Sequence, residues 1–133
     1  MTKRIVVALG GNAILTDDPS AAAQQQAIQQ TAQQLINFLA AGDVQLVLTH
    51  GNGPQVGMIN TGMEFAHINN AGTPIIPFPE CGAMSQGYIG YHLQQAIINE
   101  LQVRNTKRNC VTLVTQVLVD DNDPAFNNPT KPI

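Results

Sequence analysis

The chain has 133 residues, enough for one modest domain with a hydrophobic core and too few for two. Hydrophobic residues make up 44% of it, which is typical of a folded globular protein and argues against disorder. The formal net charge of −3 gives no basic footprint for nucleic acid or an anionic membrane, and no apolar run approaches the ~20 residues that a bilayer requires. We expect a cytoplasmic protein with reduced thiols, because the N-terminus does not resemble a signal peptide and the two cysteines lack metal-type spacing.

The first half of the chain predicts two strands joined by a long helix. Residues 4–9 (RIVVAL) and 44–49 (VQLVLT) are β-branched runs, typical of strands that are buried on both faces. A helix is expected over roughly 20–41, with Ser20 as its N-cap and Gly42 as its stop. Its apolar residues recur at steps of three and four, whereas its many glutamines mostly fall outside that stripe and predict a solvated face.

The second half predicts two more helices and a third strand. The helices are expected over about 54–66 and 82–101, with a proline- and glycine-rich connection at 71–79 between them. The inner stripe of the later helix is predicted from its spacing as Met84, Tyr88, Leu93, Ile97 and Leu101. Residues 110–119 (CVTLVTQVLV) predict the third strand. The alternation of strands and helices indicates a parallel sheet with helices on both faces, and three strands suggest half of a larger α/β unit.

Two strand ends carry similar turns, Gly10-Gly11-Asn12 and Gly51-Asn52-Gly53, the second followed by Pro54. Ligands of parallel sheets collect at the carboxyl ends of the strands, where glycine and asparagine permit close approach and positive φ. Pro54 suits the first turn of a helix, whose free N–H groups favour an anion by roughly 0.3–1 kcal/mol each. The pair of turns therefore predicts an oxyanion site built from backbone and asparagine amides, and the alternative is two ordinary tight turns.

Other interpretations of these residues are weaker. Gly51-x-Gly53-x-x-x-Gly57 resembles a variant dinucleotide fingerprint, but the expected acidic partner is missing, since Glu80 falls in the predicted loop. A Walker P-loop is excluded, because neither turn contains Gly-Lys-Ser/Thr. The histidines lack metal-ligand spacing, and His50 more often holds a turn than acts as a base. Cys81, near a helix start, is expected to be a packing residue rather than a reactive thiol.

Four blocks of this sequence, VALGGNAIL, LVLTHGNGPQVG, CGAMSQGYIGYHLQQA and DPAFNNPTKPI, resemble carbamate kinases of the amino acid kinase superfamily. The resemblance covers nearly the whole chain. It implies a three-layer αβα sandwich with a mostly parallel sheet, in a homodimer. The implied reaction is reversible phosphoryl transfer between carbamoyl phosphate and ADP, giving ATP and carbamate in arginine catabolism, with Mg²⁺ as the metal.

The resemblance also implies roles for particular residues. Gly10, Gly11, Asn12, Gly51, Asn52 and Gly53 match the family's acceptor- and phosphoryl-binding turns, and Lys131 matches a lysine that closes over the transferred group. Residues 1–133 then form the acceptor-binding half, with a protruding subdomain beginning at about 119–133. The nucleotide-binding half and its cations have no counterpart, so no nucleotide or metal is expected to be fully bound and the isolated chain is expected to be inactive. Two alternatives remain open: a non-catalytic anion-binding or dimerising remnant, and a small nucleotide-binding domain.

Overall fold

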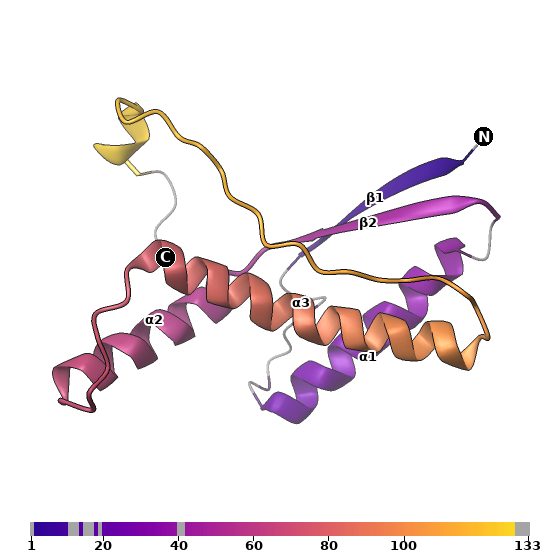
Figure 1. Cartoon of the computed structure of the whole chain (residues 1–133), viewed down its shortest axis with the longest axis horizontal. Helices are drawn as coiled ribbons and strands as arrows, with labels where there is room; N and C mark the ends of the chain where they lie inside the picture. The colour runs from indigo at the N-terminus through magenta and orange to yellow at the C-terminus, as the bar shows by residue number, and fades with distance from the viewer. Residues whose placement is uncertain (1, 11–13, 15–17, 19, 40–41, 130–133) are drawn as a thin grey trace.

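The structure, a computed structural model, describes residues 2–10, 14, 18, 20–39 and 42–129. The chain order is β1 (Lys3–Leu9), α1 (Ala21–Leu39), β2 (Val44–His50), α2 (Gly53–Ile68), α3 (Phe78–Val103) and a short 3-10 turn, η2 (Pro124–Phe126). Figure 1 shows the two strands lying above α1 and α3, with α2 displaced toward the beginning of α3. No helix in the described part of the chain is both long and apolar enough to cross a membrane.

The sheet in the described residues is a parallel pair, β1 and β2, in register from Lys3 opposite Val44 to Leu9 opposite His50. Its residues alternate, so that Val7 and Leu46 turn toward the helices, whereas Val6 is 63% exposed on the other face. The prediction that both faces of these strands are buried is therefore wrong for this structure. Because α1 and α3 pack on the same face of the sheet, the opposite face of β1 and β2 remains open.

Helix α1 follows the pattern predicted for it. Its N-cap is confirmed, because the Ala23 N–H donates to Ser20 Oγ over 3.2 Å, and Gly42 beyond its end has a positive φ of 117°. The inner stripe of α1 is buried, and most of its glutamines are exposed. The stripe packs against α3 in two apolar clusters, whose buried members are Leu9, Ile14, Ile28, Leu35, Ile89 and Leu93, and Ala32, Ile36, Ile97 and Leu101.

Helix α3 begins earlier than predicted. It starts at Phe78, so Glu80 lies in its first turn and not in a loop. A proline in the first turn of a helix lacks only an N–H that would have no partner within the helix, which explains how Pro79 is accommodated. Leu93, Ile97 and Leu101 are buried as predicted and Tyr88 packs partly buried against the core, but Met84 is 41% exposed, so its place on the inner stripe is wrong.

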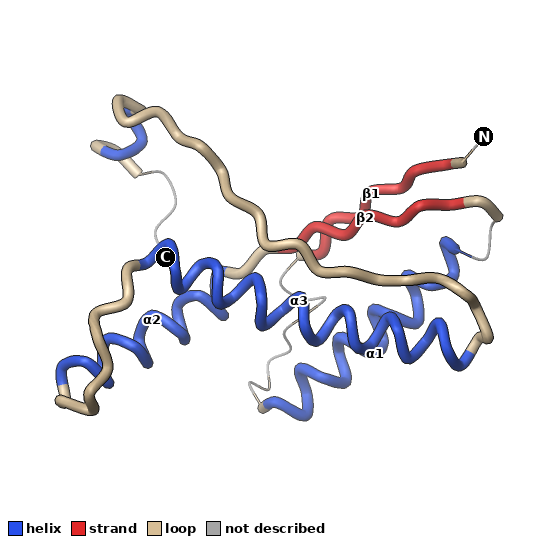
Figure 2. The backbone as a smooth tube through the Cα atoms, viewed as in Figure 1, coloured by secondary structure: helices blue, strands red, loops and turns tan. Residues whose placement is uncertain are grey.

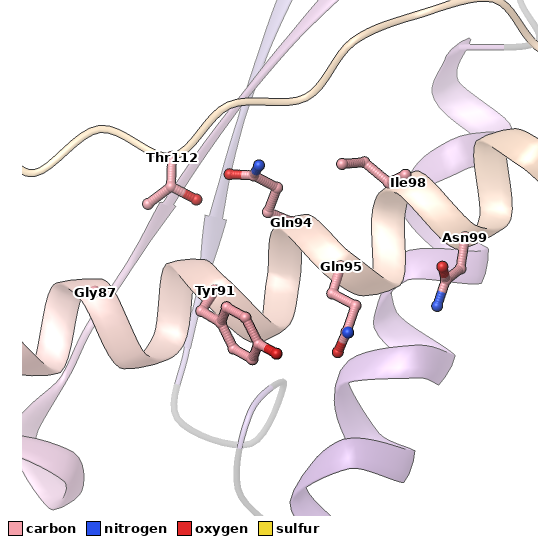
Figure 3. A pocket seen from close by; sticks show the side chains of 7 residues that line it. All are labelled: Gly87, Tyr91, Gln94, Gln95, Ile98, Asn99 and Thr112. Carbon is pink, nitrogen blue, oxygen red and sulfur yellow. The ribbon is translucent and has the colours of Figure 1, made fainter.

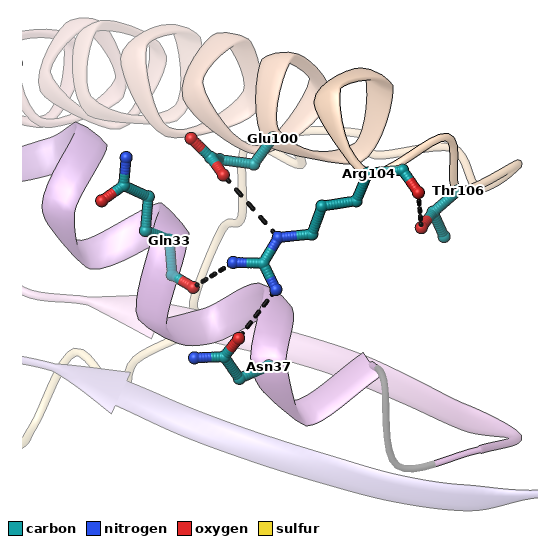
Figure 4. A network of polar contacts seen from close by, with 5 residues as sticks. All are labelled: Gln33, Asn37, Glu100, Arg104 and Thr106. Carbon is teal, nitrogen blue, oxygen red and sulfur yellow. Dashed lines mark hydrogen bonds and ion pairs between the residues drawn. The ribbon is translucent and has the colours of Figure 1, made fainter.

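The end of α3 is fastened to α1 by a polar network around Arg104 (Figure 4). The guanidinium donates to Asn37 Oδ1 over 2.7 Å and to the Gln33 carbonyl over 3.1 Å. Glu100, only 8% exposed, lies 3.8 Å from the same guanidinium through its carboxylate. A charge that is partly withdrawn from water needs such partners, and here they fix the two helices relative to each other.

The predicted third strand, residues 110–119, is not formed. This segment runs extended alongside α3 (Figure 2), but it makes no ladder with β2. A groove of about 650 Å³, lined by β2, α3 and residues 108–115, separates the two backbones. The segment bonds instead to side chains of α3: Gln86 Nε2 donates to the Thr115 carbonyl over 3.2 Å, and the Thr115 N–H donates to Gln86 Oε1 over 2.8 Å.

Candidate functional site

The carboxyl ends of β1 and β2 lie side by side. Leu9 is opposite His50 in the register, and the Gly51 N–H donates to the Leu9 carbonyl over 3.4 Å. The two strands therefore end at adjacent positions, as predicted. Gly10 is exposed next to Leu9, whereas Gly11, Asn12 and Lys131 lie outside the described residues.

The turn at Gly51, Asn52 and Gly53 opens directly into α2. Asn52 is the N-cap residue, with φ −146° and ψ 10°, and Pro54 follows within the first turn of the helix. A Cβ built on Gly51 or Gly53 would meet no described atom within 4 Å, and neither glycine has a positive φ. The expected use of positive φ is therefore wrong for these two glycines, but the open space beside their backbone is what an approaching ligand needs.

Two polar side chains hold this turn in place. His50 Nδ1 lies 3.0 Å from the Gly51 carbonyl, which can only accept, so this nitrogen carries the proton. Asn52 Nδ2 donates over 2.7 Å to the hydroxyl of Ser85, which is fully buried on α3. The role of His50 in holding the turn agrees with its prediction. Ser85 was not identified from the sequence, although a polar residue between the buried Cys81 and Ile89 on one helix face was a usable signal.

The positive charges of the described chain lie elsewhere. Lys3 and Arg4 begin β1, so they stand at the opposite end of the sheet from the turns. Arg108 donates to the carbonyls of Val44 and, over 3.1 Å, of Gly42, both at the beginning of β2. Arg104 is hydrogen-bonded to Asn37 of α1, and Lys107 directly precedes Arg108 in the sequence. The described part of the candidate site is therefore an amide-bearing turn, and the described cations do not lie beside it.

Other candidate groups do not form a second centre in the described residues. No group of three or more histidine, cysteine or acidic side chains there could hold a metal ion. His67 Nδ1 lies 3.0 Å from the Thr73 carbonyl, and the His92 ring contacts Tyr88 and Tyr91 edge-on. Both cysteines are free. Cys81 is fully buried, in agreement with a packing role.

A shallow pocket of about 460 Å³ lies on the outer side of α3 (Figure 3). Most of its lining comes from glutamine, asparagine and tyrosine side chains between residues 87 and 99, with Thr112 closing one side. Neither strand-end turn contributes to it. The pocket therefore does not belong to the predicted oxyanion site.

The described geometry is that of an α/β protein whose two parallel strands end side by side. No protein-family model matches the chain. Its sequence is 54% identical to a carbamate kinase from Staphylococcus haemolyticus over 130 residues, which are 98% of this chain and 40% of that protein.

Solved structures agree with that relationship. A carbamate kinase from Giardia superposes with a TM-score of 0.91 at 44% identity, covering 100% of this chain and 44% of the other. A Giardia lamblia carbamate kinase bound to AMP-PNP superposes with a TM-score of 0.86, also at 44% identity, covering 98% and 45%. The chain is thus related along its whole length to the carbamate kinase family, and it spans about two fifths of the length of these relatives.

Proposed function

We propose that this chain is the N-terminal, acceptor-binding half of a carbamate kinase, and that its strand-end turns bind the phosphoryl or carbamoyl group. The observation that supports the proposal is the adjacency of Leu9 and His50, because the segments that follow β1 and β2 then start from neighbouring positions. The site residues are Gly10, Gly11, Asn12, Gly51, Asn52 and Gly53. The substrates are carbamoyl phosphate and ADP, or carbamate and ATP in the reverse direction.

The complete reaction needs more than this half. Phosphoryl transfer depends on positioning and on neutralising the charge that develops on the equatorial oxygens. Amide-rich turns supply positioning, but the described cations lie at the other end of the sheet. We assign part of the charge to Lys131, in a subdomain beginning at about 119–133, and the remainder to Mg²⁺ and a nucleotide-binding half. The AMP-PNP complex of the related Giardia lamblia enzyme supports nucleotide use in the family.

The proposal is tested by the response of the 133-residue chain to inorganic phosphate and to substrates. Millimolar phosphate is expected to raise its melting temperature, because a ligand that binds the folded state stabilises it. No ATP should form from carbamoyl phosphate and ADP in the absence of a nucleotide-binding half. Absence of a phosphate effect would contradict the oxyanion site. Normal ATP formation by this chain would contradict the proposal that the reaction needs a separate nucleotide-binding half.

The same measurements separate the alternatives. A non-catalytic remnant that binds anions would respond to phosphate but would not regain ATP formation when joined to a carbamate kinase nucleotide-binding half. A small nucleotide-binding domain would give saturable heat with ATP or NAD in calorimetry. The homodimer and the cytoplasmic location remain predictions, and sedimentation of the purified chain tests the first.

A further inference from the structure

Ser85 is a buried polar residue on an otherwise apolar face of α3. It is fully inaccessible to solvent, and its neighbours one turn away on either side, Cys81 and Ile89, are equally buried. Its hydroxyl proton is donated to the Gly82 carbonyl over 2.7 Å, and its oxygen accepts from Asn52 Nδ2 over 2.7 Å. A buried hydroxyl that uses both its donor and its acceptor has a fixed direction, so it can orient the group bonded to it.

The group that Ser85 orients is the side chain of an N-cap residue. Asparagine at this position ordinarily accepts a hydrogen bond from a backbone N–H in the first turn of its own helix. Asn52 makes no such bond here, and its amide nitrogen turns to α3 instead. Because Pro54 has no N–H, the Gln55 N–H is the group that Asn52 would cap if it were released. With its amide nitrogen bonded to Ser85, Asn52 leaves the beginning of α2 without a side-chain cap in this structure.

We propose that Ser85 is a positioning residue for the oxyanion site. It holds one N–H of the Asn52 side-chain amide, so that the second N–H and the first-turn backbone of α2 face a phosphate-type oxyanion. The inference rests on the proposed function, which supplies the oxyanion as the ligand of the turn. Beyond that function, it identifies Ser85 as the residue that preorganises the turn. Preorganised donors bind a charge without first breaking bonds to their own protein, which is the source of the expected affinity.

Removal of the hydroxyl tests the inference in the 133-residue chain. In Ser85→Ala, inorganic phosphate is expected to bind roughly tenfold more weakly, the size of effect expected when hydrogen bonds to a charged group are lost. Ser85→Cys keeps the shape of the side chain, with a somewhat larger atom at its end, but offers only a weak hydrogen-bonding group, and it should weaken binding in the same direction. Ile89→Val, a small truncation one turn further along the same buried face, is the matched control and should bind phosphate like the wild type.

The spectroscopic readout is the ¹⁵N–¹H spectrum, which separates positioning from general destabilisation. In ligand-free Ser85→Ala, the Asn52 side-chain amide and the Gln55 backbone amide should both shift, because Asn52 now caps α2. Ile89→Val should leave both resonances in place. If Ser85→Ala fails to fold, the same two resonances and the phosphate titration are measured in Ser85→Cys.

The results of these experiments distinguish failure of the positioning role of Ser85 from failure of the proposed function. Phosphate binding by the wild type that is unchanged in the Ser85 variants overturns the positioning role and leaves the proposed function standing. Resonances of Asn52 and Gln55 that do not move overturn it as well. Absence of phosphate binding by the wild type overturns the proposed function and removes the ligand from the Ser85 inference. Weaker binding in both Ser85 variants with shifted amides, beside an unchanged control, supports the inference.

Discussion

Residues 44–50 and 110–119 have nearly the same kind of sequence but different structures. Both are β-branched apolar runs, yet only the first forms a strand, paired with β1 along its whole length. In β2, Leu46 and Leu48 pack against the helices, whereas Leu118 in the later segment is 99% exposed. In this structure, the apolar β-branched run that has a partner strand within hydrogen-bonding reach forms a strand, and the run without one does not.

The largest expected effect tests whether apolar residues stabilise the two regions unequally. Ile97 is 5% exposed, between α1 and α3, so Ile97→Ala should lower the free energy of unfolding by about 2–5 kcal/mol. Leu118→Ala removes a side chain that is 99% exposed, and its effect should stay within about 0.5 kcal/mol. Urea denaturation followed by far-UV circular dichroism measures both. Comparable losses would show that the later segment also packs in a core.

A second prediction concerns the close approach of that segment to α3. A Cβ at Gly90 would lie 2.1 Å from Thr112 Cγ2, and the Thr112 hydroxyl donates to the Gly90 carbonyl over 3.0 Å. Gly90→Ala should therefore displace the segment and destabilise the protein by about 1–3 kcal/mol. The control is Gly87→Ala, where the added Cβ meets nothing within 4 Å and α3 should gain about 0.5–1 kcal/mol.

Denaturation midpoints measure the stability of these variants, and amide exchange at Thr115 measures the attachment of the segment. Exchange should accelerate in Gly90→Ala and not in Gly87→Ala. The double variant Gly90→Ala/Thr112→Ala removes the clashing methyl group and should recover part of the lost stability. Equal stabilisation by both glycine replacements would mean that the segment does not rest on α3 at Gly90.

The elements that sequence patterns predicted correctly are those whose partners are local or lie on the same predicted face. The periodic stripe of α1 and its Ser20 cap followed from spacing alone, and so did the adjacency of the two strand ends. The failed predictions depend on partners that are distant in the sequence. Burial of Val6 would require a layer on the second face of the sheet, and a strand at residues 110–119 would require pairing with the sheet. The spacing of apolar residues along the chain does not reveal which distant elements pack against them.

The candidate site also contains some residues that the sequence could predict and others that it could not. Gly51 and Gly53 could be predicted as turn residues from the sequence, because a tight turn depends on the types of a few consecutive residues. The bond from Asn52 to Ser85 joins positions 33 residues apart, and only the packing of α2 on α3 brings them together. A polar residue on a buried helix face signals that a partner exists, but the sequence does not say which one.

The smallest expected effect lies at Cys110, where the exposed segment meets the core. Its half-buried side chain packs against the cluster of Ala32, Ile36, Ile97 and Leu101, and burial raises the pKa of its thiol. The folded protein therefore holds this proton to a higher pH than the unfolded chain does, so stability from this group is complete below the unfolded thiol pKa. It decreases as the pH rises above about 8.5 toward the folded value.

Alkylation by iodoacetamide measures this difference directly, in a Cys81→Ala background so that only Cys110 reacts. The pH midpoint of the rate should be higher in the folded protein than in urea, because the thiolate is the reacting form. Cys110→Ser should also reduce the loss of stability above about pH 8.5, since it removes the titrating thiol. Identical midpoints in the folded and unfolded states would place Cys110 in solvent with Leu118. A raised midpoint would instead set the boundary between the packed and the exposed region at this residue.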